Sequence, residues 1–189
     1  MRIVILGAGY VGLVSAACFA AFGVQVTVVD PDAARIAALK AGKIPIYEPE
    51  LDALVAQNVA AGRLYFQTAL DDLTDVAAVF IAVGTPSRRG DGHADLAYVY
   101  AAAEQIARAL PAGQFTVVVT KSTVPVGTGR EVMRRMHAAN PDADFAVCSN
   151  PEFLREGSAI NDFMRPDRVV IGADDARALD FLSLFQLVF

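Results

Sequence analysis

Three glycines near the amino terminus, Gly7, Gly9 and Gly12, stand in the spacing G-x-G-x-x-G. Their physical roles differ: the first lets the chain turn, the second lets a pyrophosphate approach the backbone, and the third lets a helix pack closely on a strand. A helix that begins at such a turn directs free N–H groups and the positive end of its dipole at the phosphates. The spacing therefore predicts a dinucleotide-binding turn.

An acidic residue follows this turn at the expected distance. Asp30 comes eighteen residues after Gly12, at the end of the apolar run 24–29. A carboxylate there can accept hydrogen bonds from both hydroxyls of an adenosine ribose and repels a 2′-phosphate, so NAD is favoured over NADP. Arg35 comes shortly afterwards, close to where this ribose is expected; the alternative is that Arg35 is only a solvated charge.

Polar residues also follow later apolar runs. Thr85 follows the run 77–83, and the polar triplet 121–123 follows the run 115–120. Ligands of an open parallel sheet bind outside the carboxyl ends of its strands, so these residues are candidates for contact with a cofactor or substrate. For Thr85, an ordinary turn after a strand is the competing interpretation.

Two carboxylates stand four residues apart after another apolar run. Glu152 and Glu156 follow the run 144–149, and Arg155 lies between them. This group is a candidate acid/base or sugar-binding site. Taken alone, a solvated helix start explains it nearly as well.

The elements needed to position these residues alternate along the chain. Strands are expected at 3–6, 24–29, 64–68, 77–83, 115–120, 144–149 and 168–172. Helices are expected at 11–22, 31–40, 49–60, 96–110, 128–137 and from 174 onward. This alternation is typical of a doubly wound parallel sheet, so the predicted fold class is α/β with a Rossmann-type NAD-binding domain. We expect that domain to span 1–172, followed by an apolar helical tail at 173–189.

Composition excludes several other classes of protein. The net charge of −5 argues against a nucleic-acid surface, which needs clustered Lys and Arg. The apolar stretch after Met1 could be a signal peptide or membrane span, but three glycines at fingerprint spacing interrupt it. Cys18 and Cys148 are the only cysteines and both lie in apolar surroundings, so we expect no disulfide framework, no metal site and a cytoplasmic location.

Six features together resemble a known family. Besides Asp30, the sequence contains in order the motifs GAGYVG, PIYEPEL, VGTP, KSTVPVGT and NPEFLREG. From Met1 to about Gly172 the chain resembles the N-terminal half of the UDP-glucose 6-dehydrogenases, within the wider UDP-glucose/GDP-mannose dehydrogenase family. The resemblance implies oxidation of UDP-glucose to UDP-glucuronate with two NAD molecules and a cysteine thiohemiacetal between the two steps. The alternatives are a GDP-mannose 6-dehydrogenase, a UDP-N-acetylhexosamine dehydrogenase, or an NAD-binding module without catalytic activity.

The resemblance also implies roles for residues of the cofactor site. Tyr10 and Val11 would line the pyrophosphate turn, and Asp30 and Arg35 would flank the adenosine ribose. The family usually has Lys where this chain has Arg35, so the charge is kept while the geometry differs.

A second set of roles concerns the reacting end. Thr85, Thr123 and Glu156 would contact the cofactor, the two threonines at its nicotinamide half. Thr123 would also position a water for which Glu156 is the acid/base partner. The floor of the sugar site would be formed, mostly through backbone groups, by Glu152, Phe153, Leu154, Arg155 and Glu156.

The remaining parts of the family's machinery follow the region that this chain matches. They include the nucleophilic cysteine, the lysine and asparagine that hold the oxyanion, and the domain that grips the uridine. The resemblance implies that 173–189 leads toward a central helix and this substrate domain, and that the full-length enzyme is a homodimer. We therefore expect the helix in 179–189 to face water in the chain by itself.

Overall fold

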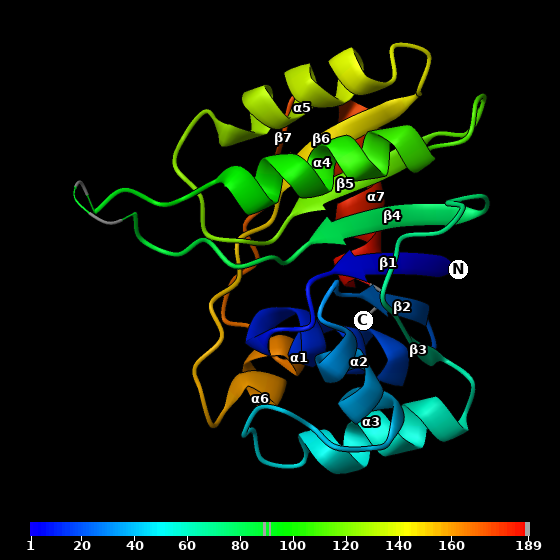
Figure 1. Ribbon diagram of the computed structural model, residues 1–189, viewed down its shortest axis with the longest axis vertical. Coiled ribbons are helices and arrows are strands. Elements are labelled where there is room, and N and C mark those ends of the chain that lie inside the picture. Colours follow the sequence, from blue (N-terminus) through cyan, green and yellow to red (C-terminus); the bar gives the residue numbers. More distant parts are fainter. Residues whose placement is uncertain (89, 91, 188–189) are drawn as a thin grey trace.

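The strands of the chain form one sheet with a reversal in its strand order. The computed structural model describes residues 1–88, 90 and 92–187 of the 189-residue chain. The sheet order is β3-β2-β1-β4-β5-β6-β7, parallel except for β7, which pairs antiparallel with β6 (Figure 1). The strands are β1 (Arg2–Leu6), β2 (Gln25–Val29), β3 (Leu64–Gln67), β4 (Val76–Ile81), β5 (Thr116–Thr120), β6 (Phe145–Ser149) and β7 (Gly172–Ala173). The predicted doubly wound α/β fold is confirmed.

Helices cover both faces of this sheet. They are α1 (Tyr10–Ala21), α2 (Ala33–Lys40), α3 (Leu51–Ala60), α4 (Ala97–Ala109), α5 (Thr128–Ala139), α6 (Ala159–Met164) and α7 (Ala176–Leu187). Successive residues of a strand point to opposite faces. In β1, Ile3 and Ile5 join the core under α1, whereas Val4 and Leu6 join the core under α4 and α5. Burial on both faces explains why the strands read as continuous apolar runs.

The first helix lies unusually close to the end of β1. A Cβ added to Gly12 would lie only 2.0 Å from the carbonyl oxygen of Gly7. Gly7 itself has φ +107°, and a Cβ there would lie 2.5 Å from the carbonyl oxygen of Ala82, after β4. The Gly7 N–H donates to the carbonyl of Val29, 2.8 Å away, after which the chain leaves β2. The turn is therefore closed against both neighbouring strands.

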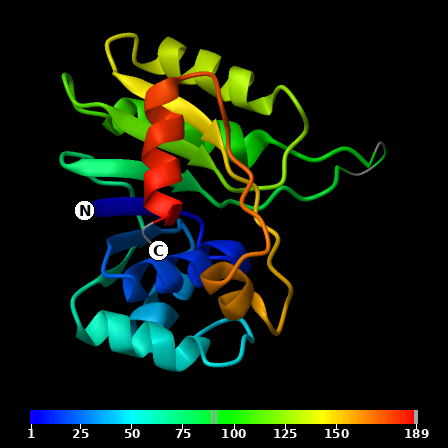
Figure 2. The ribbon, with the colours of Figure 1, turned by 180° about the vertical axis from the view of Figure 1, so that it is seen from behind.

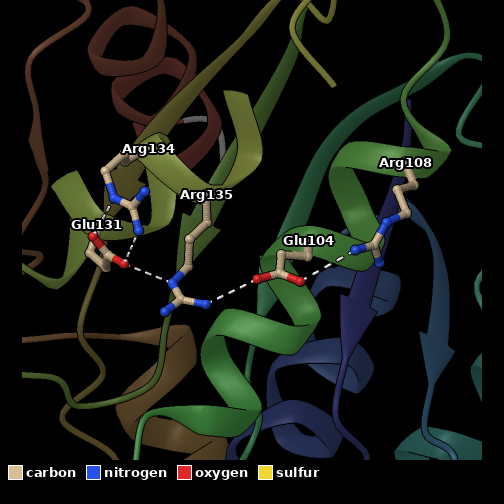
Figure 3. Close-up of polar contacts among 5 residues, drawn as sticks. All are labelled: Glu104, Arg108, Glu131, Arg134 and Arg135. Atoms are coloured by element: carbon tan, nitrogen blue, oxygen red, sulfur yellow. Dashed lines mark hydrogen bonds and ion pairs between the residues drawn. The ribbon is translucent and has the colours of Figure 1, made fainter. Parts of the chain in front are cut away.

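Ion pairs join α4 to α5 on the face opposite α1. Arg135 of α5 contacts Glu104 of α4 at 3.0 Å and Glu131 of its own helix at 2.8 Å (Figure 3). Arg108 and Arg134 extend the group at its two ends. Individual exposed pairs contribute little stability, so we assign this network the modest role of aligning the two helices.

The structure corrects the strand expected at 168–172. Only Gly172–Ala173 pairs with β6. Val169 and Val170 remain 44% and 43% exposed, and the Val170 carbonyl accepts a hydrogen bond from the Asn150 side chain at 2.9 Å. These valines are therefore not part of a buried strand, although their residue type suggested one.

The structure also corrects, for its first part, the expectation that the helix in 179–189 faces water; the side chains from 184 onward lie outside the described residues. Figure 2 shows α7 crossing the side of the sheet that faces away from α4 and α5. Ala178 and Leu182 are fully buried in the core under α1. Arg177 contacts Asp144 at 3.0 Å and stacks over the Phe115 ring, 4.0 Å from its centroid. The first turns of α7 therefore belong to the packed domain. Within the described part of the chain, no helix has both the length and the apolarity needed to cross a bilayer.

The Gly12 contact gives a test of this packing. We expect Gly12→Ala to lower the free energy of unfolding by about 3 kcal/mol or more, because the added methyl overlaps backbone that cannot easily move. The matched control is Gly129→Ala in α5. Apart from its two chain neighbours and the nearby backbone of its own helix, no described atom lies within 4 Å of a Cβ added there. Ala favours helix over Gly by about 1 kcal/mol, so this variant should be as stable as wild type or more so. Urea unfolding measures both, and wild-type stability of Gly12→Ala contradicts the packing described.

Candidate cofactor and substrate site

The candidate site lies at the carboxyl edge of the sheet, where the strand order reverses. The chain leaves β1 at Gly7 and leaves β4 toward Thr85, and these two strands are neighbours. In doubly wound sheets the crevice at this reversal binds the ligand. The Thr85 hydroxyl donates to the carbonyl of Thr123, 3.3 Å away, so the structure brings together two of the predicted contact residues.

The glycine turn presents an open helix end to this edge. Gly9 is the residue before α1, and no side chain caps the helix there. Apart from its own neighbours, no described atom lies within 4 Å of a Cβ placed on Gly9, in contrast to Gly7 and Gly12. Free N–H groups, the helix dipole and unfilled space are what a pyrophosphate requires. Tyr10 and Val11 are the first residues of this helix, so the residues present fit a dinucleotide.

Asp30 lies beside the same turn. Its carboxylate is 6% exposed and accepts hydrogen bonds from the backbone N–H of Ala8 at 2.8 Å and of Asp32 at 3.0 Å. Arg35 approaches it to 3.0 Å and Asp32 to 3.8 Å. The Arg35 guanidinium is therefore shared between two carboxylates, so these three side chains together keep a net negative charge, which would oppose a 2′-phosphate.

The polar triplet after β5 separates into three different environments. Ser122 donates from its hydroxyl to the carbonyl of Val83 at 2.7 Å, which ties the end of β5 to that of β4. Lys121 is 5% exposed and donates to the Asn150 side chain at 3.1 Å. Thr123 alone is exposed. Of the three, only Thr123 is available to a ligand at the edge.

Lys121 is held in a partly apolar environment. Burial lowers the pKa of its ammonium to about 8, although the nearby Glu152 carboxylate opposes this change. The ammonium lies 5.6 Å from the centroid of the Phe163 ring. Lys121 also lines a cavity of about 580 Å³ beside α6. Among described residues, this lining includes the segment 151–155, whereas Thr123 and Glu156 lie outside it.

The proposed sugar floor offers mainly backbone to a ligand. Glu152 folds back to accept from the N–H of Leu154, and Arg155 turns toward α6, where it pairs with Asp162 at 2.6 Å. Glu156 is exposed. These side chains are either committed to local structure or directed to solvent.

One residue of this site was missed as a functional candidate. Glu48 lies in the motif PIYEPEL and is 7% exposed. Its carboxylate accepts from the Tyr10 hydroxyl and from the backbone N–H of Gly157 at 2.7 Å and of Ala159 at 2.9 Å. The sequence signal was present, since two prolines bracket an aromatic and an acid, but the partners lie far along the chain: Tyr10 is 38 residues away, and Gly157 and Ala159 are 109 and 111 residues away.

Electrostatics around Glu48 favour its ionised form. Burial by itself raises the pKa of this carboxyl, but the bonds from Tyr10 and from the backbone N–H groups of Gly157 and Ala159 outweigh it and lower the pKa. In return, burial and the Glu48 carboxylate raise the pKa of Tyr10 to about 12. At neutral pH the pair is therefore a neutral phenol donating to a carboxylate.

Neither cysteine offers a nucleophile to this edge. Cys18 is fully buried in α1, and burial raises its pKa to about 12. Cys148 is 1% exposed in β6, and burial raises its pKa to about 11. Both thiols therefore stay protonated at neutral pH, and they behave as small core residues.

The sheet order, the glycine turn and the acid after β2 define a Rossmann-type dinucleotide-binding domain. Comparison with known proteins narrows this class. Residues 1–186 match the family described as "UDP-glucose/GDP-mannose dehydrogenase family, NAD binding domain". The chain belongs to this family, whose domain binds NAD.

Individual relatives agree with this assignment. UDP-glucose 6-dehydrogenase of Rhizobium meliloti is 65% identical over 189 residues, which cover 97% of this chain and 42% of the relative. The structure of a UDP-glucose dehydrogenase from Pyrobaculum islandicum superposes with a TM-score of 0.93 at 44% identity, over 100% of this chain and 44% of that one. A ternary complex of GDP-mannose dehydrogenase from Pseudomonas aeruginosa gives a TM-score of 0.91 at 39% identity, over 97% and 43%. The chain thus spans about two fifths of the length of its relatives.

Buried Lys121 leads to a pH-dependent prediction. Its pKa is about 8 in the folded chain and near its ordinary 10.5 when unfolded, so between these pH values the unfolded chain holds more protons. This group therefore makes the free energy of unfolding rise with pH, by up to about 3 kcal/mol over that window. In urea unfolding from pH 7 to 10, the free energy of unfolding should rise less with pH for Lys121→Met than for wild type.

The matched control for this measurement is Lys40→Met, at an exposed lysine of α2. Its stability should follow the pH dependence of wild type. If Lys121→Met also follows the wild-type curve, Lys121 is not a buried cation in solution and its assigned environment is wrong.

Proposed function

We propose that this chain is the cofactor-binding part of a UDP-glucose 6-dehydrogenase, which oxidises the C6 alcohol of UDP-glucose to a carboxylate with two NAD molecules. The observation that supports the proposal is that the open α1 terminus, the adjacent Asp30 and the Thr85–Thr123 contact lie at the carboxyl edge of a sheet whose chain matches the family's NAD-binding domain. The Rhizobium meliloti relative at 65% identity bears that enzyme's name.

Each group at this edge has a proposed task. NAD, when bound, supplies the hydride acceptor. Gly7, Gly9, Tyr10, Val11 and Gly12 form the turn that holds the pyrophosphate, and Asp30 with Arg35 holds the adenosine ribose. Thr85 and Thr123 contact the nicotinamide half, and Glu156 also contacts the cofactor.

The substrate side rests on the segment after β6. Residues 152–156 form the floor of the sugar site through their backbone, which suits the local commitment of their side chains. Thr123 positions a water, and Glu156 exchanges a proton with it. An exposed carboxylate next to an open edge is suited to such exchange because it can reach both solvent and ligand.

The alternatives to a UDP-glucose enzyme are a dehydrogenase of another nucleotide sugar and an NAD-binding module without catalytic activity. A GDP-mannose dehydrogenase shares the fold at a TM-score of 0.91, and so does a UDP-D-ManNAc dehydrogenase from Pyrococcus horikoshii at 28% identity. The fold therefore does not discriminate between these sugars. The higher identity to a UDP-glucose enzyme favours UDP-glucose. A non-catalytic NAD-binding module has no need of Thr123 and Glu156, and both are present and exposed.

The proposal extends to the whole protein. We propose that residues 1–172, with the first turns of α7 packed on them, are the NAD-binding domain, and that the rest of 173–189 begins the connection to a substrate domain that supplies the cysteine. A homodimer is proposed from the family resemblance, and a cytoplasmic location from two buried cysteines that form no disulfide.

The function is tested by NADH absorbance. The full-length protein should produce NADH from UDP-glucose and NAD, and it should do so faster than from GDP-mannose. The 189-residue chain should bind NAD without steady NADH production, since completing the second oxidation requires a thiohemiacetal, and Cys18 and Cys148 do not supply the reactive thiolate that forms it. Steady NADH production by this chain alone contradicts the proposed division of labour.

Asp30 is expected to set the cofactor preference. Calorimetric titration of the chain should show NAD binding at least about tenfold more tightly than NADP. Asp30→Asn should weaken NAD about tenfold, because a hydrogen bond to a charged acceptor contributes about 1.5 kcal/mol or more. Asp32→Asn makes the same charge change next to the site and should alter the affinity less than threefold. Equal affinities of wild type for NAD and NADP overturn the assignment.

Glu156 is expected to serve chemistry rather than folding. In the full-length enzyme, Glu156→Gln should reduce kcat by a factor on the order of 10² or more, with little change in Tm, since its side chain is exposed. Asp142→Asn, an exposed acid before β6, is the matched control and should keep both values. Wild-type kcat in Glu156→Gln refutes the acid/base role.

A further inference from the structure

The contacts of Glu48 join two functional motifs that are far apart in sequence. The Tyr10 hydroxyl comes from the first residue of α1, within GAGYVG. The N–H of Gly157 comes from the residue directly after Glu156, within NPEFLREG. A single buried carboxylate therefore touches both the cofactor turn and the proposed substrate segment (Figure 1 shows α6 beside α1).

Glu48 is the buried carboxylate among several contacts that hold this segment, which include the Arg155–Asp162 pair and the Tyr10 hydroxyl 3.5 Å from the Arg155 carbonyl. Residues 151–155 have no regular secondary structure, and Gly157 has φ +85°. Ala159 begins α6, so its N–H is one of the unpaired donors at the start of a helix. The side chain of Ser158, the N-cap residue of α6, accepts no hydrogen bond from the backbone of that helix. Glu48 thus satisfies the start of α6 from a distant part of the chain.

The chemistry of this contact specifies a carboxylate. The two carboxylate oxygens of Glu48 accept hydrogen bonds from one hydroxyl and two backbone N–H groups, so every partner in these bonds is a donor. A Gln of the same shape has one acceptor oxygen, and its NH₂ group would face a donor. Moving a charge into a buried place is costly unless such bonds compensate it, which they do at Glu48.

We propose that Glu48 is a positioning residue for the reaction: its carboxylate fixes Gly157 and the start of α6 against α1, and thereby holds Glu156 and the sugar floor beside the cofactor turn. The assignment of a task to Glu156 rests on the proposed function. The contact itself does not, so the two can fail separately.

The anchoring is tested by amide hydrogen exchange in the 189-residue chain without cofactor. Glu48→Gln should speed exchange at Gly157 and Ala159 on the order of tenfold, the loss expected when one hydrogen bond is removed. Amides of α4 and α5 should exchange as in wild type. Asp142→Asn, which removes an exposed charge elsewhere, should change neither set.

A second variant keeps the test decisive if Glu48→Gln does not fold. Tyr10→Phe removes the hydroxyl, which donates to Glu48 and also lies 3.5 Å from the Arg155 carbonyl, and leaves the ring in place. It should speed exchange at Gly157 and Ala159 by a smaller factor, about two- to fivefold. Exchange at these amides within twofold of wild type in a folded Tyr10→Phe chain, or an equal acceleration over the whole chain, overturns the anchoring.

The positioning role is tested by kinetics of the full-length protein. Glu48→Gln should lower kcat at least tenfold while KM for NAD stays within threefold, at a temperature where the variant is fully folded. A purely structural role predicts a lower Tm with wild-type kcat, and that result overturns the proposal. If wild type does not oxidise UDP-glucose, the proposed function fails, and amide exchange still decides whether Glu48 anchors the segment.

Discussion

The close contact between α1 and the end of β1 is the constraint on which the site depends. Since the position of a Gly12 Cβ is only 2.0 Å from the Gly7 carbonyl, the helix can approach only without a side chain there. This approach places the open helix end at Gly9 where the strand order reverses. It also sets Tyr10 within reach of Glu48. The same turn that suits a pyrophosphate thus positions Tyr10, through which Glu48 connects the turn to the proposed substrate segment.

Buried polar groups then arrange the loops around this turn. Asp30 holds the backbone at Ala8, Glu48 holds the segment after Glu156, and Lys121 joins the ends of β5 and β6 through Asn150. Each is less than a tenth exposed: the Asp30 and Glu48 carboxylates each accept from two backbone N–H groups, and Lys121 donates to Asn150. Satisfied polar networks of this kind rigidify loops, whereas the loss of one partner leaves a costly buried group. The edge is therefore organised before any ligand binds.

The features of the fold and site that can be predicted from the sequence are those set by the spacing of nearby residues. The glycine turn, Asp30 and the alternation of strands with helices follow from short-range patterns and from burial of a parallel sheet on both faces. Long-range partners do not follow. The oxygens of Glu48 accept from donors 109 and 111 residues away. Lys121 follows a strand and is expected at the exposed edge of the sheet, but its side chain is buried beside Asn150 and Phe163. The segment 168–171 has valines typical of a strand, yet the residues that pair with β6 are Gly172 and Ala173, which follow it.

The central claim is that a dinucleotide binds across the α1 terminus with its adenosine ribose at Asp30. Amide chemical shifts of the isotope-labelled 189-residue chain, followed by NMR during titration with NAD, test this most directly. The account predicts that the largest changes fall on Gly9, Tyr10, Val11 and Asp30, with smaller ones at Thr85. Saturating NAD that leaves these amides unchanged, or that shifts mainly the residues around the cavity beside α6, contradicts it.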